Sequence, residues 1–433
     1  MVSVKSNFDP AEPERNKSSY FESSRNKSSY ITLVFCTLAT VGILLILAFQ
    51  SRWRYHLEVD IWGFYYPRFS YFLENLSFGK FGDNEYMPGA MFSFLIPGIA
   101  LVILPNTWQN YLIGLFAINI ILIVCHLFIY RKISQVSPFI FLAIILAAGP
   151  IVLYRHDLFV SLFLLISLIL WKSKKSMLAP FFLGIAASIK IFPVLILPYF
   201  LLSQTAEQES RKIFKITITF LIGLFSILGL YLLTGARIGE ILATLNYNAT
   251  KPVHIESLWG SLLTLINAGV DGTWPRGLGD RGIFGIHPQD IFLPLTFYNY
   301  FWLVPMSFFY FKIYRNFKNQ ESVFPVAFLI ILLFIIFSKI LTPQYLFWFA
   351  TLFPLLNFYK IPSKLNAAPI LIMIAALLLT QFIYPLHYNE LLGIFYTSGQ
   401  RAEFFFILLS RNLLLVILFF IIYKYVQKIS QNQ

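Results

Sequence analysis

Residues 31–67 read ITLVFCTLATVGILLILAF and then QSRWRYHLEVDIWGFYYP, so a long apolar run is followed directly by a polar segment that contains Asp60. The run 31–49 is near the ~20 residues that a helix needs to cross the hydrocarbon core of a bilayer. An ionised side chain at the bilayer centre costs about 2.5–3.5 kcal/mol or more, so Asp60 is expected outside the hydrocarbon. This stretch predicts a membrane-spanning helix that leads into a polar loop.

The same apolar pattern recurs along the rest of the chain. Its 433 residues are 58% hydrophobic and only 12% charged, and the mean hydropathy is +0.71. The runs are continuous blocks rather than the alternating strands of a barrel, so we predict an all-α polytopic membrane protein with about twelve spans. Several runs are short or contain Pro, so broken or tilted helices are expected. The predicted spans are 31–49, 88–104, 110–130, 137–154, 157–171, 179–202, 212–234, 291–314, 323–341, 344–359, 367–385 and 402–424.

The composition also argues against several classes of protein. The net charge of +13 is spread over short loops, as expected for contacts with anionic lipid headgroups rather than for nucleic-acid binding. Cys36 and Cys125 lie in apolar runs and predict no disulfide framework. We find no P-loop, no zinc-ligand spacing and no Gly-x-Ser-x-Gly nucleophile elbow, and the 6 His residues are scattered. Neither a metal site nor a cofactor is predicted.

The Lys and Arg residues set the expected orientation in the membrane. The segment 1–30 is polar, contains a duplicated Arg-Asn-Lys-Ser-Ser-Tyr sequence and is expected to be a disordered cytoplasmic tail without a cleavable signal. Twelve spans then make the tail 426–433 cytoplasmic and leave one membrane domain, 31–425. The basic loops at 131–132 and 172–175 contradict this topology, so a re-entrant segment within 131–178 would change the count by one or two. The predicted outer loops are 50–87, 235–290 and 386–401.

Asp60 is the leading catalytic candidate. It lies in a loop rich in aromatic residues, in which the segment 58–66 is expected to form a short helix on the membrane surface. A carboxylate at this position can act as a general base that accepts a proton from a hydroxyl nucleophile. The alternative is a solvated loop carboxylate that pairs with Arg54 or Arg68.

Two charged positions interrupt the apolar runs. Arg155-His156-Asp157 is either a tight turn in which Asp157 caps the next helix, or a site where Arg155 binds an anionic group and Asp157 orients it. Lys190 lies about eleven residues from either end of its run, roughly 16 Å at helical rise, too far for its stem to reach the interface easily. An intramembrane Lys indicates a functional site by default, and the phosphate of a lipid carrier is a natural partner for it.

Two further segments combine polar and aromatic residues. In the segment 251–257, Lys251 and His254 can contact a phosphate or a sugar, whereas Glu256 and Ser257 can instead cap the following helix. The segment 338–348 separates two apolar runs and forms either part of a sugar or lipid pocket or an ordinary loop in an aromatic belt. Its pocket candidates are Lys339, Gln344, Tyr345 and Trp348.

Together these segments resemble glycosyltransferase family 87 of the GT-C superfamily, which includes mycobacterial polyprenyl-phosphate-mannose-dependent mannosyltransferases. The resemblance covers most of residues 31–425. Asp60 with Tyr65 and Tyr66 resembles the first outer loop, and Glu85-Tyr86-Met87-Pro88 resembles the entry to the second span. The other matches are Arg155 to Phe159 with an Arg-x-Asp segment, Gly184 to Pro193 with a Gly/Lys/Pro pattern around Lys190, Lys251 to Ser257 with Arg-x-x-Gln-x-Glu-Ser, and Lys339 to Tyr345 with Lys-x-x-Ser-Pro-Gln-Tyr.

This chain departs from the family pattern at three positions. Lys251 and His254 stand where the pattern has Arg and Gln, and Thr342 stands for Ser. A Lys binds a phosphate as a point charge, without the fork of an Arg. The affinity for the donor lipid, or its identity, is therefore expected to differ.

The resemblance implies a GT-C-like helical bundle that transfers a mannose-like hexose from a polyprenyl-phosphate sugar to a hydroxyl of a lipid or glycan acceptor. Asp60 would be the catalytic base and the anomeric centre would invert. The lipid-linked donor would be a co-substrate, so no cofactor or metal is implied. The expected location is the bacterial plasma membrane, with the active site on the outer face. The implied donor-binding residues are Arg155, Asp157, Lys190, Lys251, His254 and Glu256, and the implied pocket residues are Tyr65, Tyr86, Lys339, Gln344 and Tyr345.

Two other functions are open at this point. A transporter or flippase for an anionic lipid or sugar would explain Lys190 and the broken helices. It would not need a carboxylate at Asp60, and the two halves of the chain show no internal repeat. The second alternative is a polymerase or ligase for polyprenyl-linked glycans, which would also act at the outer face.

The sequence makes no prediction of the oligomeric state, the sugar or the acceptor.

Overall fold

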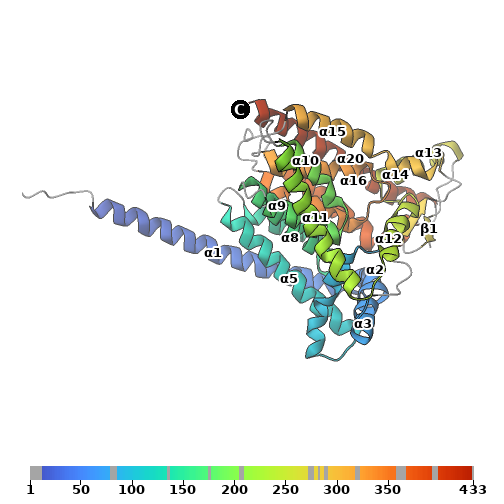
Figure 1. Ribbon diagram of the computed structural model, residues 1–433, viewed down its shortest axis with the longest axis horizontal. Helices are drawn as coiled ribbons and strands as arrows, with labels where there is room; N and C mark the ends of the chain where they lie inside the picture. The colour runs from blue at the N-terminus through green and yellow to red at the C-terminus, as the bar shows by residue number, and fades with distance from the viewer. Residues whose placement is uncertain are drawn as a thin grey trace, which may run out of the picture.

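A computed structural model describes residues 12–431 of the chain with internal gaps. The gaps are 79–84, 134–136, 174–176, 204–208, 272–276, 281–282, 287–290, 317–321, 357–366 and 393–397. Within the described residues the fold is a bundle of helices with one short β-hairpin, which confirms the all-α membrane class. Figure 1 shows the helices packed side by side, with the N-terminal part of α1 extending beyond the bundle.

Five helices are long and apolar enough to cross a membrane, counted over the residues that the structure describes. Their apolar parts are Tyr30–Ala48, Trp108–Lys132, Ser210–Leu233, Ala367–Leu386 and Ala402–Lys428. The twelve-span count stays a prediction, because the other apolar runs fold into shorter pieces. The long helices are α1 (Glu12–Ala48), α5 (Trp108–Lys132), α11 (Glu209–Leu233), α18 (Ala367–Gln381) and α20 (Ser398–Gln431).

The remaining apolar runs form shorter helices, and several of these runs are interrupted, as expected from their Pro content. The run 137–154 breaks at Gly149, whose φ is +72°, and the run 179–202 breaks at Lys190, ahead of Pro193. These pieces are α4 (Pro88–Leu95), η2 (Pro97–Val102), α6 (Pro138–Ala148), α7 (Ile151–Tyr154), α8 (Asp157–Lys172), α9 (Leu178–Ile189), η3 (Phe192–Ile196), α10 (Leu197–Leu202), α16 (Val323–Phe337), η7 (Pro343–Leu346), α17 (Phe347–Ala350) and η8 (Phe353–Leu356).

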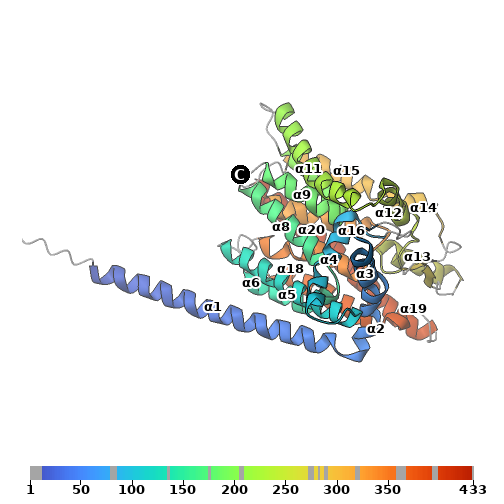
Figure 2. The same cartoon turned by 60° about the horizontal axis from the view of Figure 1, so that its bottom comes forward.

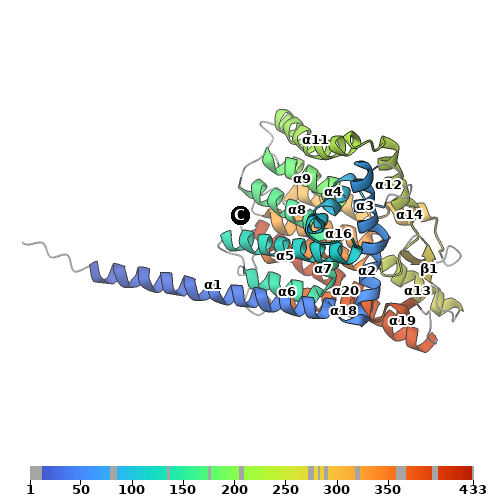
Figure 3. The same ribbon diagram turned by 90° about the horizontal axis from the view of Figure 1, so that it is seen from below.

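Short elements gather at the end of the bundle away from the C-terminus (Figures 2 and 3). The hairpin there is antiparallel, with Gly277 opposite Ile286, and Ile286 N donates to Val253 O at 2.8 Å. From this end α15 (Leu303–Asn316) runs back along the bundle. The elements at this end are α2 (Ser51–Asp60), η1 (Ile61–Tyr65), α3 (Tyr66–Asn75), α12 (Ile238–Thr250), α13 (Leu258–Asp271), β1 (Gly277–Asp280), β2 (Ile283–Ile286), α14 (Leu295–Tyr300), η11 (Phe382–Leu386) and α19 (Tyr388–Leu392).

Close helix packing in the bundle depends on glycine. A Cβ at Gly184 of α9 would lie 2.2 Å from Phe220 O, and a Cβ at Gly223 of α11 would lie 2.1 Å from Phe181 O. The two backbones therefore approach each other as closely as small residues allow in membrane helix pairs. The helix that packs in this way, α9, ends at Ile189, and the extended backbone of Lys190 follows it.

The two terminal helices extend into polar sequence. Residues 12–30 form the first turns of α1, and α20 continues to Gln431. Extending an existing helix adds one hydrogen bond per residue without a new nucleation step, which explains how polar flanks stay helical. Residues 1–11 lie outside the described residues.

Candidate functional site

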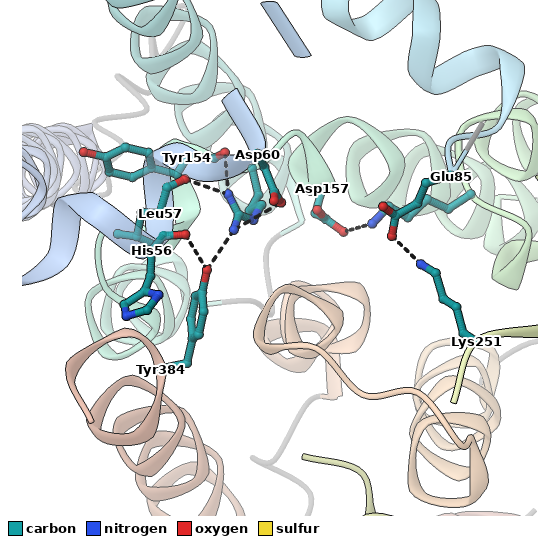
Figure 4. Close-up of polar contacts among 10 residues, drawn as sticks. His56, Leu57, Asp60, Glu85, Tyr154, Asp157, Lys251 and Tyr384 are labelled. Carbon is teal, nitrogen blue, oxygen red and sulfur yellow. Dashed lines mark hydrogen bonds and ion pairs between the residues drawn. The ribbon is translucent and has the colours of Figure 1, made fainter. Parts of the chain in front are cut away.

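Charged side chains from five separate segments meet at the end of the bundle that carries α2 and α12. Six residues form this charged cluster, and Figure 4 shows their contacts. Three ion pairs connect them: Asp60 with Arg155, Asp157 with Lys190, and Glu85 with Lys251. The charged cluster is therefore Asp60, Glu85, Arg155, Asp157, Lys190 and Lys251.

Asp60, the last residue of α2, pairs with Arg155. Arg155 Nη2 lies 3.2 Å from Asp60 Oδ2, and Arg155 Nη1 donates to Leu57 O at 3.0 Å. The alternative partners behave differently in the described contacts, since Arg54 binds Glu58 Oε1 at 2.8 Å and Arg68 donates to Phe64 O at 3.0 Å.

The position of Arg155 is fixed from two sides. Asn119 in α5 donates to Leu153 O at 2.8 Å and to Arg155 O at 3.0 Å, which satisfies the backbone at the break between α7 and α8. Tyr384 Oη accepts from Arg155 Nη2 at 3.1 Å and donates to His56 O at 2.8 Å (Figure 4). Tyr384 precedes a Pro and has extended backbone, φ −118° and ψ 120°, as the residue before Pro prefers. This break in the helix directs the tyrosine to α2.

Asp157 is not the helix cap that one interpretation of the sequence predicts. His156 occupies the N-cap position without a side-chain cap, and Asp157 is the first residue of α8. Its Oδ1 accepts hydrogen bonds from Lys190 Nζ and from Trp348 Nε1, both at 2.7 Å. Lys190 Nζ also lies 5.1 Å from the centre of the Trp348 ring and 5.4 Å from that of Tyr345, within the range of cation–π attraction.

The segment after α12 brings Lys251 to Glu85. The ammonium group of Lys251 binds Glu85 Oε1 and lies 4.7 Å from the centre of the Tyr247 ring. Lys339 holds this segment, because its Nζ donates to Ala249 O at 2.8 Å and to Lys251 O. Lys339 thus binds carbonyl groups at the end of α12, where a cation is stabilised by the helix dipole.

His254 and Glu256 lie in the same segment but outside the charged cluster. In the described part of the chain, neither side chain forms a hydrogen bond or ion pair with a member of that cluster. Glu256 Oε2 lies 3.7 Å from Arg411 Nη2, and Asn412 Nδ2 donates to Glu256 O at 3.3 Å and to Ser261 Oγ at 2.7 Å. Burial raises the pKa of Glu256 to about 7 although Arg411 opposes the shift. These contacts anchor the start of α13 to α20.

The predicted capping of α13 is present at Ser257. Its Oγ accepts from Gly260 N at 2.9 Å. Gln344 lies in η7 beside Tyr345, and among the described residues its side chain has no polar contact with the charged cluster. Tyr345 stacks on Trp348, with 3.8 Å between the ring centres.

The charged cluster acts as one electrostatic unit. Burial raises the pKa of Asp60, Arg155 opposes this most strongly, and Glu85, Lys190 and Lys251 act on the same carboxyl. Two more cations flank the group: Arg68 interacts with Glu85, and Lys339 with Lys251. Among the described residues this makes five cationic side chains against three carboxylates, an excess of two positive charges.

An aromatic group lies against the cluster. Tyr65 of η1 stacks on Phe94 with 4.7 Å between ring centres, and the Tyr86 ring lies 5.8 Å from that of Tyr65. His156 packs 4.6 Å from both Tyr65 and Phe94. The predicted pocket residues Tyr65 and Tyr86 therefore lie together beside Arg155 and Asp157.

Sequence reasoning missed three residues that the structure places in or near this site. Glu85 was part of a motif but had no assigned role, although it neutralises Lys251. Arg411 lies within the apolar run 402–424, so the intramembrane-charge signal that singled out Lys190 would also have found it. Tyr384 gives no signal of its own apart from the Pro that follows it.

Comparison of the sequence with protein-family models and with curated proteins finds no match.

Proposed function

We propose that this chain is a membrane glycosyltransferase that moves a hexose from a polyprenyl-phosphate sugar to a hydroxyl of a lipid or glycan, with inversion. The observation that carries the proposal is the ion pair of Asp60 with the buried Arg155, in the same charged cluster as Lys190 and Lys251, whose charges act on the Asp60 carboxyl. A base and a binding site for an anionic leaving group are the two elements that this reaction requires.

In the proposed reaction the acceptor hydroxyl gives its proton to Asp60. Its oxygen bonds to the anomeric carbon, and the bond from that carbon to the phosphate oxygen breaks with its electron pair going to the phosphate. The products are the glycosylated acceptor and a polyprenyl phosphate with one more negative charge. Arg155 contacts Asp60 Oδ2, so Oδ1 is the oxygen that takes the proton.

The structural contacts suggest a division of labour among the cations. The guanidinium group of Arg155 already contacts Asp60, Leu57 O and Tyr384. We therefore assign Arg155 to orienting the base rather than to binding the phosphate. Lys190 and Lys251 are each paired with a carboxylate in the ligand-free chain. The excess of two positive charges in this region matches the two negative charges of the released polyprenyl phosphate, and such preorganised charge stabilises a transition state.

The proposal is tested by reconstituting the purified protein in liposomes with radiolabelled polyprenyl-phosphate mannose and a bacterial lipid extract as acceptor. The expected result is that label moves to a new lipid or glycan while polyprenyl phosphate is released. Parallel reactions use a glucose donor. Transfer from the glucose donor alone would mean that the proposed sugar is wrong but the proposed reaction is right. Label that stays on polyprenyl phosphate with every donor and acceptor would contradict the proposal.

A transporter of an anionic polyprenyl-linked sugar is the second candidate. It is supported by the interrupted helices, which put Lys190 between α9 and η3 and Lys339 between α16 and η7. Discontinuous helices with charged groups at the break are typical of transporter binding sites. The same liposomes distinguish the two functions, because a transporter would deliver the labelled donor, chemically unchanged, to the opposite leaflet.

A further inference from the structure

His156 is a buried polar residue whose hydrogen-bonding capacity is not used within the described part of the chain. Its side chain is 1% exposed, and neither Nδ1 nor Nε2 has a hydrogen-bond partner among the described residues. Leaving a buried polar group without a hydrogen bond destabilises the folded state. Such exceptions are few in native structures, and each calls for an explanation such as a bound ligand or a catalytic role.

The surroundings of His156 narrow that explanation. Its neighbours Arg155 and Asp157 each carry one ion pair of the charged cluster, to Asp60 and to Lys190 respectively. Arg155, Asp157 and Lys190 all act electrostatically on the imidazole. Three rings surround it, with centres at 4.6 Å for Tyr65 and Phe94 and 5.7 Å for Tyr86. His156 therefore adjoins Arg155, which pairs with the proposed base, and Asp157, which pairs with Lys190 of the proposed phosphate site.

We propose that His156 is a sugar-binding residue whose ring N–H donates to a hydroxyl oxygen of the transferred hexose. This inference rests on the proposed function. In that reaction the sugar must lie between the acceptor, which is beside Asp60, and the phosphate, which is beside Lys190. Among the described residues His156 is an uncharged polar side chain beside both ion pairs whose ring nitrogens have no partner, and a neutral donor suits a neutral hydroxyl.

Aromatic rings enclose the imidazole, so one of these rings has to move before a sugar can reach it. Tyr86 packs edge-on against His156 and is only partly buried. It belongs to the same segment as Glu85, which contacts Lys251. We assign the opening to Tyr86, and the edge of the cluster there is accessible, since the side chains of Asp60 and Glu85 are 24% and 25% exposed.

The test compares two variants, His156→Phe and His156→Gln, in detergent without any ligand and then with two probes. The probes are polyprenyl phosphate and polyprenyl-phosphate mannose. Wild type is expected to bind the sugar-bearing probe more tightly, and His156→Phe is expected to lose that advantage, about tenfold, with unchanged binding of the bare phosphate. His156→Gln retains an N–H donor and is expected to recover part of the difference.

The measurement without ligand tests the inference independently of any transfer reaction. If the imidazole has no partner in the protein, His156→Phe should unfold at the same temperature as wild type or higher, because an apolar ring removes an unsatisfied group. A clear loss of stability that His156→Gln restores would overturn the inference. So would an unchanged preference of His156→Phe for the sugar-bearing probe. Failure of wild type to bind either probe would instead count against the proposed function.

Discussion

At the residue scale, the proposed chemistry depends on how firmly one guanidinium group holds one carboxylate. Arg155 contacts Asp60, the backbone of α2 and the hydroxyl of Tyr384. A buried carboxylate without such a partner would take up a proton at higher pH and lose its value as a base. Burial raises the pKa of Asp60 and Arg155 opposes that shift, so this contact sets the pH at which the carboxylate could act as a base in the proposed reaction.

Tyr384→Phe is predicted to shift the acid limb of the transfer reaction to higher pH. Removing the hydroxyl loosens Arg155, the opposing effect of Arg155 on the Asp60 pKa weakens, and the carboxylate is protonated at a higher pH. The pH dependence of kcat/KM measures this. Tyr154→Phe is the matched control, because the Tyr154 hydroxyl donates to Ala48 O and not to the cluster. An acid limb that stays in place in Tyr384→Phe would contradict the role of this hydroxyl.

Glu256 predicts a pH dependence of stability. Its pKa rises from an ordinary 4.5 to about 7 in the folded chain, so the folded state binds the proton more tightly than the unfolded state. Stability from this group is therefore complete below about pH 4.5 and is lost as pH rises through 7, on the order of 2–3 kcal/mol. Thermal unfolding of wild type and Glu256→Gln at pH 5 and pH 8 tests this. Wild type should lose stability relative to the variant over that interval, and parallel profiles would contradict the assignment.

The individual candidates were predictable from the sequence, whereas their pairing was not. Asp60, Arg155 and Lys190 stand out because charge is rare in this chain. Their partners lie up to 229 positions away, as for Arg155 and Tyr384. Such pairs depend on how helices pack, which a single sequence does not reveal. For the same reason Glu256, predicted as a donor-binding residue, turns out to pair with Arg411 of α20, whereas His254 N donates to Lys339 O.

At the element scale, helix breaks rather than helices place the functional groups. Arg155 and Asp157 lie at the break between α7 and α8, Lys190 follows α9, and Tyr384 precedes Pro385. Apolar runs with Pro and Gly predicted that some helices would be broken. The number of spans did not follow from the same signal, because a broken run and a full span have similar composition.

Gly184→Ala is predicted to destabilise the chain by about 1–3 kcal/mol through overpacking. Its Cβ would lie 2.2 Å from Phe220 O, a backbone atom that cannot move without shifting α11. The control is Gly229→Ala in α11, the helix that packs on α9, since nothing lies within 4 Å of a Cβ at Gly229. This variant should change stability by less than about 1 kcal/mol. Thermal unfolding in detergent compares the two. Equal effects would contradict the close packing of α9 on α11.

At the scale of the whole molecule, the charged cluster lies at one end of the helical bundle, away from the C-terminus (Figure 3). The proposed reaction takes place on the outer face of the bacterial plasma membrane, so this end must face outward. The cytoplasmic C-terminus that the Lys and Arg distribution predicts agrees with that orientation.

Cysteine labelling tests the orientation directly. Cys36 and Cys125 are replaced by Ala, and a single Cys is introduced at Tyr55 of α2, which is 72% exposed, or at the exposed Lys428 of α20. In intact cells a membrane-impermeant maleimide should label Tyr55→Cys, whereas Lys428→Cys should react only after lysis. The reverse pattern would place the cluster on the cytoplasmic side.

The most direct test of the central claim is the turnover of Asp60→Asn in the reconstituted transfer assay. The amide keeps the shape of the side chain but cannot accept the proton, so turnover is predicted to fall about 10²–10⁴-fold. Binding of polyprenyl phosphate should persist, because Lys190 and Lys251 remain. Glu58→Gln, on the same helix and paired with Arg54 instead of Arg155, should transfer sugar like wild type. Near-normal turnover of Asp60→Asn would contradict the assignment of Asp60 as the base.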